Sequence, residues 1–145
     1  MQVALNPILL VDDSDNDVEL MLIALEKLNI ANPIVICHDG QEALDYLFNA
    51  ENATKPLPLF IMLDIKMPKV DGLEVLAKIK EAEHLKRIPV VMLTSSREHR
   101  DLISSYDLNV NAYVVKPVDF KQFTETVSSL GYFWAIVNES PAKNN

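Results

Sequence analysis

The sequence predicts an α/β protein whose doubly wound, five-stranded parallel sheet is covered by helices on both faces. Along its 145 residues, five short apolar runs alternate with longer stretches that have helical spacing. The apolar runs do not alternate between apolar and polar residues, as is typical of parallel strands buried on both faces. The length suits one domain over residues 1–145, with a core at about 7–130 and a C-terminal extension at about 131–145.

The predicted strands are residues 8–11, 34–37, 59–63, 89–93 and 112–115. The predicted helices lie between and after them, at about 14–28, 41–49, 73–82, 98–106 and 119–130. Asp13 and Ser14 are capping candidates for the first helix. The apolar stripe of that helix consists of Val18, Met21, Leu22, Leu25 and Leu28.

Composition limits the classes of function. A net charge of −8 disfavours binding to nucleic acid, which needs a positive face. No apolar run reaches the roughly 20 residues that span a membrane, and no signal peptide is recognisable, so we expect a cytoplasmic protein. Cys37 is the one cysteine, and its apolar run predicts a buried thiol.

Polar residues that could carry chemistry stand at the carboxyl ends of four predicted strands. They are Asp12 and Asp13, Asp64, Thr94 with Ser95, and Lys116 with Pro117. In an open parallel sheet these ends form the ligand-binding edge, so the side chains should converge. Carboxylate oxygens suit Mg²⁺. A carboxylate beside such a cation can attack a phosphoryl group, with Lys116 neutralising charge and the Thr94 hydroxyl donating to a phosphoryl oxygen.

Each of these elements has a simpler interpretation when taken alone. Two aspartates after a strand are often only a helix cap, which remains a second role for Asp13. The acids that follow, Asp15, Asp17 and Glu19, are expected to face solvent and to carry no chemistry, although two of them favour the helix N-terminus electrostatically.

The motifs VDD at 11–13, LDIKMPKVDG at 63–72, MLTSS at 92–96 and YVVKP at 113–117 resemble those of response-regulator receiver domains of two-component signalling. The resemblance implies a flavodoxin-like (βα)₅ fold with strand order 2-1-3-4-5, and a phosphoryl group accepted on Asp64. It also implies a cis peptide bond between Lys116 and Pro117. The ligands implied for Mg²⁺ are Asp12 (largely through water), Asp13, Asp64 and the main-chain carbonyl of Lys66.

The resemblance further implies a switch and a set of partners. Phosphorylation would draw Thr94 inward, and the Tyr113 ring would follow, altering the surface of the fourth helix, fifth strand and fifth helix. The ring could instead serve only in packing. The partners implied are a sensor histidine kinase and a downstream protein target or phosphotransfer protein, with no nucleic acid or membrane.

Two segments depart from the common receiver pattern. The loop at 50–58 is long, and residues 130–137 extend the last helix with large apolar side chains, among them Tyr132, Phe133 and Ile136. Such an apolar group favours a partner surface, and we expect a homodimer through the fifth strand, the last helix and this extension. These features resemble the small receivers paired with bacterial phytochromes. Core packing is the interpretation that we prefer for Trp134.

Two other functions would use part of this pattern. Phosphatases and phosphomutases of the haloacid dehalogenase type also use a strand-end aspartate with Mg²⁺, but they need a second acid where this chain has Lys66. A degenerate receiver acting as a constitutive binding scaffold would not need every site residue, and all are present here. We therefore expect a phosphoacceptor signalling module, not an enzyme with a metabolic substrate, and expect Lys66 and Ser96 to influence the phosphoryl lifetime.

Overall fold

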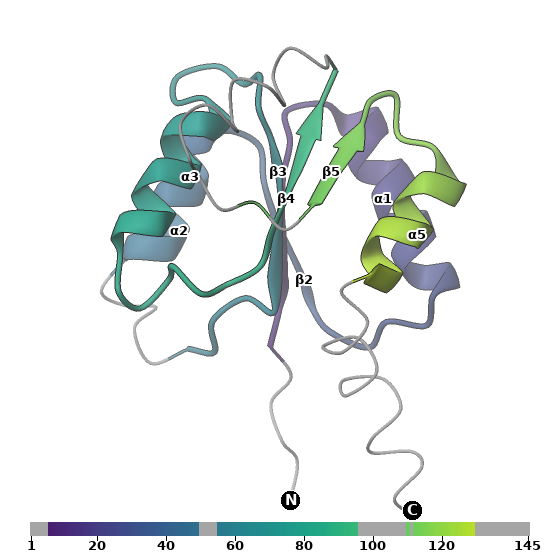
Figure 1. Ribbon diagram of the computed structural model, residues 1–145, viewed down its shortest axis with the longest axis horizontal. Helices are drawn as coiled ribbons and strands as arrows, with labels where there is room; N and C mark the ends of the chain where they lie inside the picture. The colour runs from purple at the N-terminus through teal and green to yellow at the C-terminus, as the bar shows by residue number, and fades with distance from the viewer. Residues whose placement is uncertain (1–5, 50–54, 96–109, 111, 130–145) are drawn as a thin grey trace, which may run out of the picture.

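A five-stranded parallel sheet lies between two layers of helices (Figure 1). The computed structural model describes residues 6–49, 55–95, 110 and 112–129. The strand order is β2-β1-β3-β4-β5 and all neighbouring strands are parallel. In Figure 1, α2 and α3 cover one face of the sheet and α1 and α5 cover the other. The predicted fold class and strand order are confirmed.

The strands are β1 (Ile8–Val11), β2 (Ile34–Cys37), β3 (Phe60–Asp64), β4 (Val90–Thr94) and β5 (Ala112–Val115). Strands β3 and β4 begin and end one residue later than predicted. Pro89 cannot donate a backbone hydrogen bond, which favours a strand start after it. Asp64 and Thr94 belong to the strands because they pair with Leu93 and Val115 of the neighbouring strands.

The described helices are α1 (Asp15–Lys27), α2 (Gly40–Phe48), α3 (Gly72–Glu81) and α5 (Phe120–Ser129). The side chains of Ser14, Asp39 and Asp71 cap the first three by accepting a hydrogen bond from the backbone N–H three residues later. Ser14, not Asp13, is therefore the N-cap of α1. The predicted helix at 98–106, the end of the fifth helix and the C-terminal extension, including Trp134, lie outside the described residues.

Side-chain alternation along the strands produces two apolar cores. Leu9, Leu63 and Met92 pack on the face of α2 and α3, whereas Leu10, Met62 and Val114 pack on the face of α1 and α5. Phe120, the first residue of α5, does not join these cores: it is 47% exposed and lies beneath the Lys27 ammonium. No described helix is long and apolar enough to cross a membrane.

Cys37 is buried as predicted. Burial, and then the neighbouring acids Glu42 and Asp39, raise the pKa of the thiol to about 12. The thiol is therefore protonated and unreactive at neutral pH.

Candidate metal centre

The alternation of side chains along the strands brings three charged side chains to the same face of the sheet. Asp12 follows β1, Asp64 ends β3 and Lys116 follows β5. The residues two positions earlier, Leu10, Met62 and Val114, all belong to the core beneath α1 and α5. Because side chains alternate along a strand, Asp12, Asp64 and Lys116 project on this face as well. The Lys116–Pro117 peptide bond is cis, as expected.

The Lys116 ammonium lies at the centre of a group of carboxylates. Its Nζ is 3.0 Å from Asp12 Oδ2, 3.1 Å from Asp64 Oδ2 and 2.9 Å from Asp17 Oδ2. These side chains are largely withdrawn from water, since Asp12 is fully buried and Lys116 is 15% exposed. An ion pair in such surroundings is screened little by solvent.

Three carboxylates form a group that could hold a metal ion. One oxygen each from Asp12, Asp13 and Asp64 lies within 4.8 Å of the other two. Asp13 is exposed, whereas Asp12 and Asp64 are buried. Asp12 Oδ1 accepts hydrogen bonds from the Ser14 N–H and Lys116, but the buried Oδ2 accepts no well-directed hydrogen bond despite its proximity to Nζ. A divalent cation with oxygen ligands fits this donor set.

The charges of the cluster shift its titration. Desolvation, and then the charge of Asp12, raise the pKa of Asp64 to about 7, and Lys116 offsets only part of this. Burial alone would lower the pKa of Lys116, but Asp17, Asp64 and Asp12 outweigh it and the pKa is raised. The single positive charge of Lys116 therefore does not neutralise the negative charge of the carboxylates. A bound cation would neutralise more of it.

Thr94 and Tyr113 project on the other face of the sheet. Thr94 is fully buried and pairs with Val115 of β5, while Tyr113 pairs with Met92, two residues earlier on β4. Tyr113 packs against the core that contains Met92. Because side chains alternate along a strand, Thr94 lies on the same face as Met92. The two predicted switch residues, Thr94 and Tyr113, therefore share a face and are offset by two residues along the strands.

The loop from β3 to α3 borders the other side of the acids. Lys66 and Asp13 both line a cavity of about 490 Å³, together with Ile65, Met67, Pro68, Asp71 and Leu73. Gly72 packs so closely that an added Cβ would lie 2.1 Å from the backbone oxygen of Asp64. Lys69 takes a left-handed backbone conformation with φ 68° and reaches Asp39 at 3.5 Å.

The prediction that the Asp17 side chain faces solvent is wrong. We expected its side chain to face solvent, but it pairs with Lys116 and is 16% exposed. The sequence does contain a sign of this burial: Asp17 lies one helical turn before the buried Met21 and so continues the inward-facing stripe of α1. Asp15 and Glu19 are exposed, as expected.

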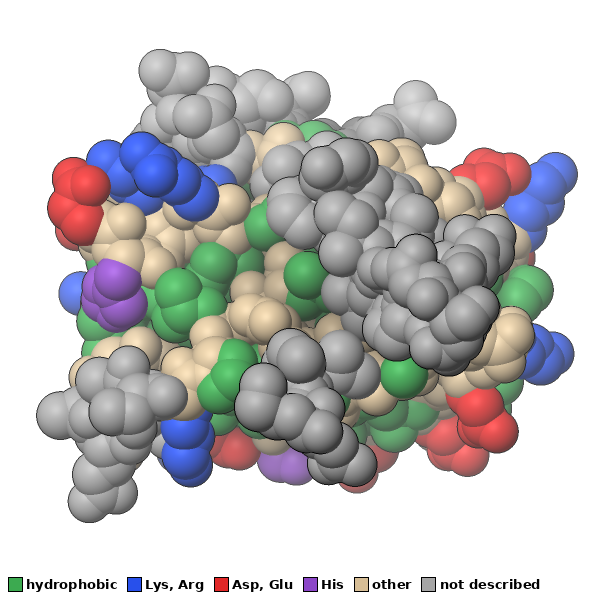
Figure 2. All heavy atoms as spheres, turned by 90° about the horizontal axis from the view of Figure 1, so that it is seen from below, with side chains coloured by type: hydrophobic (Ala, Val, Ile, Leu, Met, Phe, Trp, Pro, Cys, Tyr) green, Lys and Arg blue, Asp and Glu red, His purple; other side chains and the backbone are tan. Residues whose placement is uncertain are grey.

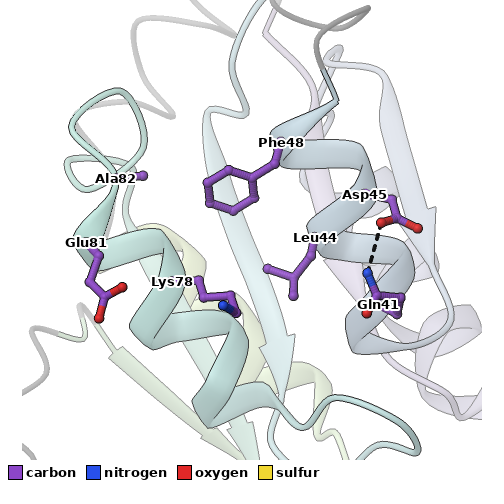
Figure 3. A pocket seen from close by; sticks show the side chains of 7 residues that line it. All are labelled: Gln41, Leu44, Asp45, Phe48, Lys78, Glu81 and Ala82. Atoms are coloured by element: carbon purple, nitrogen blue, oxygen red, sulfur yellow. Dashed lines mark hydrogen bonds between the residues drawn. The ribbon is translucent and has the colours of Figure 1, made fainter.

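Another cavity, of about 610 Å³, lies away from the acids between α2 and α3 (Figure 3). Its apolar lining is Leu44, Phe48 and Ala82, and Gln41 donates a hydrogen bond to Asp45 at its border. Figure 2 shows the end of the molecule at which the strands begin, where acidic and basic side chains lie around the rim. The acids of the candidate metal centre lie at the opposite end of the strands.

Comparison with known proteins gives a consistent family. Residues 8–128 match the model of the response regulator receiver domain. The response regulator Rcp1 of Synechocystis is 41% identical over 136 residues, which cover 93% of this chain and 92% of that protein. A probable methanogenesis regulatory protein, FilR2 of Methanothrix harundinacea, is 42% identical over 134 residues, covering 92% and 86% respectively.

Solved structures agree with this result. The bacteriophytochrome response regulator AtBRR is 55% identical, with a TM-score of 0.81 over 94% of this chain and 100% of that one. The Mn²⁺-bound form of Rcp1 has a TM-score of 0.74 over 90% and 94% of the two chains. The order of the strands, the acids at their ends and the family match lead to one conclusion: this chain belongs to the response regulator receiver family.

Proposed function

We propose that this chain is a phosphoacceptor response regulator that receives a phosphoryl group on Asp64 in a Mg²⁺-dependent reaction. The observation that carries the proposal is the convergence of Asp12, Asp13, Asp64 and Lys116 at one end of the sheet. In the proposed reaction these residues would supply an acceptor carboxylate, oxygen ligands for a cation and an ammonium within one small volume.

Asp64 supplies the nucleophile. A carboxylate oxygen attacks the phosphorus of a phosphohistidine or of a small acyl phosphate, and a new oxygen–phosphorus bond forms. The bond from phosphorus to the donor breaks, and the leaving group keeps the electron pair. Lys116 is 3.1 Å from Asp64 and neutralises charge that gathers on the transferring group. We assign the Thr94 hydroxyl to a phosphoryl oxygen.

The metal ligands that we assign are Asp12, Asp13 and Asp64, with the main-chain carbonyl of Lys66. When bound, Mg²⁺ would neutralise phosphoryl oxygens and favour the ionised form of Asp64. Oxygen-only ligands and an exposed Asp13, which leaves room for water, favour this ion. The existence of a Mn²⁺-bound form of the related Rcp1 supports the binding of a divalent cation by this chain.

The output is a changed binding surface. We propose that Thr94 moves toward the phosphoryl group and that Tyr113 follows, since the two share a face of the sheet. Such a switch biases two states of one surface. The donor is a sensor histidine kinase, and relatives that are phytochrome response regulators favour a bacterial phytochrome. The recipient is a downstream protein or a phosphotransfer protein.

Labelling tests the function directly. The protein is incubated with Mg²⁺ and acetyl phosphate, and a base- and hydroxylamine-labile phosphoryl adduct is sought by intact mass spectrometry. The adduct should form on the wild type and disappear in Asp64→Asn and on chelation. Asp45→Asn, which removes an acid on α2 away from the candidate metal centre, is the matched control. Labelling that persists in Asp64→Asn would refute the assigned acceptor.

The homodimer is a separate proposal that uses the fifth strand, the last helix and residues 131–145. Light scattering at increasing concentration, with and without acetyl phosphate, tests it. A mass that stays at that of one chain under all conditions would exclude the dimer. That outcome would leave the phosphoacceptor function intact.

A further inference from the structure

Among the described residues, Asp17 is the one ion-pair partner of Lys116 that does not lie at a strand end. Its Oδ2 lies 2.9 Å from Nζ, at least as close as the oxygens of Asp12 and Asp64. Both side chains are largely buried, with 15% of Lys116 and 16% of Asp17 exposed. The contact joins the first turn of α1 to the end of β5, across a separation of about 100 residues.

The three carboxylates around Lys116 match the three donors of an ammonium group. Two of them, Asp12 and Asp64, are also members of the group that can hold a metal ion, whereas Asp17 is not. A phosphoryl group on Asp64 and a cation on Asp12 would therefore draw away two of the three partners. Asp17 would then be the carboxylate that remains to pair with Lys116.

We propose that Asp17 is a positioning residue for phosphoryl transfer, which holds the Lys116 ammonium beside the acceptor while Asp12 and Asp64 are engaged. This inference rests on the proposed function. A long, flexible lysine side chain without such a partner would lose its orientation, because holding it costs conformational entropy. The rigid first turn of α1, capped by Ser14, supplies the fixed point.

The same helix offers a matched control. Asp15 also lies in the first turn of α1, carries the same charge and favours the helix N-terminus equally, but it is exposed. A purely helical role for Asp17 would make Asp15→Ala and Asp17→Ala equivalent. A role through Lys116 makes them different.

The experiment measures the phosphorylation rate of Asp64 at saturating Mg²⁺ over a range of acetyl phosphate concentrations. Asp17→Ala should lower the maximal rate roughly tenfold, the loss typical of one charge-assisted hydrogen bond. The donor concentration at half-maximal rate should change little, and Asp15→Ala should match the wild type. In a Lys116→Ala background, adding Asp17→Ala should change the rate less than twofold.

A second measurement avoids the slow rates of the Lys116 variant. Heteronuclear NMR of the Lys116 ammonium should give a resolved signal in the wild type and in Asp15→Ala, and lose it in Asp17→Ala. Equal rates and equal signals for the two alanine variants, with a wild type that accepts the phosphoryl group, would overturn the inference and leave the function standing. A wild type without an Asp64 adduct would refute the function itself.

Discussion

The two sides of the acidic site differ in how their charges are balanced. On the side of α1, Asp12 and Asp17 surround Lys116, and all three side chains are mostly buried. On the side of the β3–α3 loop, Asp13 is exposed and borders a cavity that the loop lines. One side is closed and paired, and the other is open. For the proposed reaction, we therefore expect the cation and the donor to enter from the loop side, and the α1 side to hold the ammonium in place.

Among substitutions on the α1 side, Lys116→Ala should have the largest effect, because it removes the ammonium that pairs with the carboxylates. It leaves Asp12 fully buried without its cation, so the free energy of unfolding should fall by about 3–5 kcal/mol in the absence of divalent metal. Urea denaturation with EDTA measures this. Lys69→Ala removes an ion pair that is 68% exposed on the lysine and should cost less than about 0.5 kcal/mol. Equal stabilities for the two variants would mean that the ammonium does not balance the site.

On the open side, Gly72→Ala should have the largest effect. Its Cβ would meet the backbone oxygen of Asp64 at 2.1 Å and the Cα of Ile65 at 2.8 Å. Backbone cannot rotate away as a side chain can, so the loop must shift, at a cost of about 1–3 kcal/mol. Affinity for Mg²⁺, measured by calorimetry, should fall with stability. A variant that keeps full Mg²⁺ affinity would show that the loop does not position a ligand.

Asp64 links the stability of the protein to pH. Its pKa is raised in the folded state to about 7, so the native state binds a proton that the unfolded state has released between about pH 4 and 7. The contribution of this group to stability is therefore largest below pH 4 and is lost as the pH rises to 7.

Asp64→Asn removes this dependence. Relative to the wild type, the metal-free variant should gain roughly 2 kcal/mol of stability between pH 5 and pH 8, since each unit of pKa shift corresponds to about 1.4 kcal/mol. Thermal or urea unfolding at the two pH values checks the gain. Mg²⁺ at pH 8 should stabilise the wild type and not the variant. A difference between the two proteins that does not vary with pH would contradict the raised pKa.

The smallest expected effect concerns the conformation of the loop. Lys69 has a φ of 68°, which glycine adopts without the steric cost that a side chain incurs. Lys69→Gly relieves this cost and loses an exposed ion pair with Asp39, so the net gain should be about 0.5–1 kcal/mol. Differential scanning calorimetry measures it, with Lys69→Ala as the control that keeps the strain. A gain in stability in both variants would show that the side-chain interactions of Lys69, and not its backbone conformation, destabilise the wild type.

Much of the site could be predicted from sequence because a parallel sheet brings strand ends together. Asp12, Asp64, Thr94 and Lys116 each follow an apolar run, and the rule for strand ends needs no side-chain detail. Asp17 was missed because it was interpreted as one of several acids at a helix start, without weighing its place on the buried stripe.

The loop is harder to predict. Gly40 and Gly72 are required because neighbouring backbone lies within 1.9 Å and 2.1 Å of where a Cβ would stand. The first contact joins Gly40 to Val70, far away in the sequence, and the second joins Gly72 to Asp64 across the β3–α3 loop. Neither contact is recorded in the local periodicity of the sequence. The shift of β3 and β4 by one residue has the same origin, because ladder pairing with the next strand decides where each strand ends.

The alternation of side chains along β4 and β5 has a consequence for evolution. Lys116 and Asp64 project on one face of the sheet and Thr94 and Tyr113 on the other, so a single-residue insertion in either strand would exchange the occupants of the two faces. Under the proposed function, substitutions could tune phosphoryl transfer and the switch independently, but changes in strand length could not. The lengths of these two strands should therefore be far less free to drift than those of the loops that connect them.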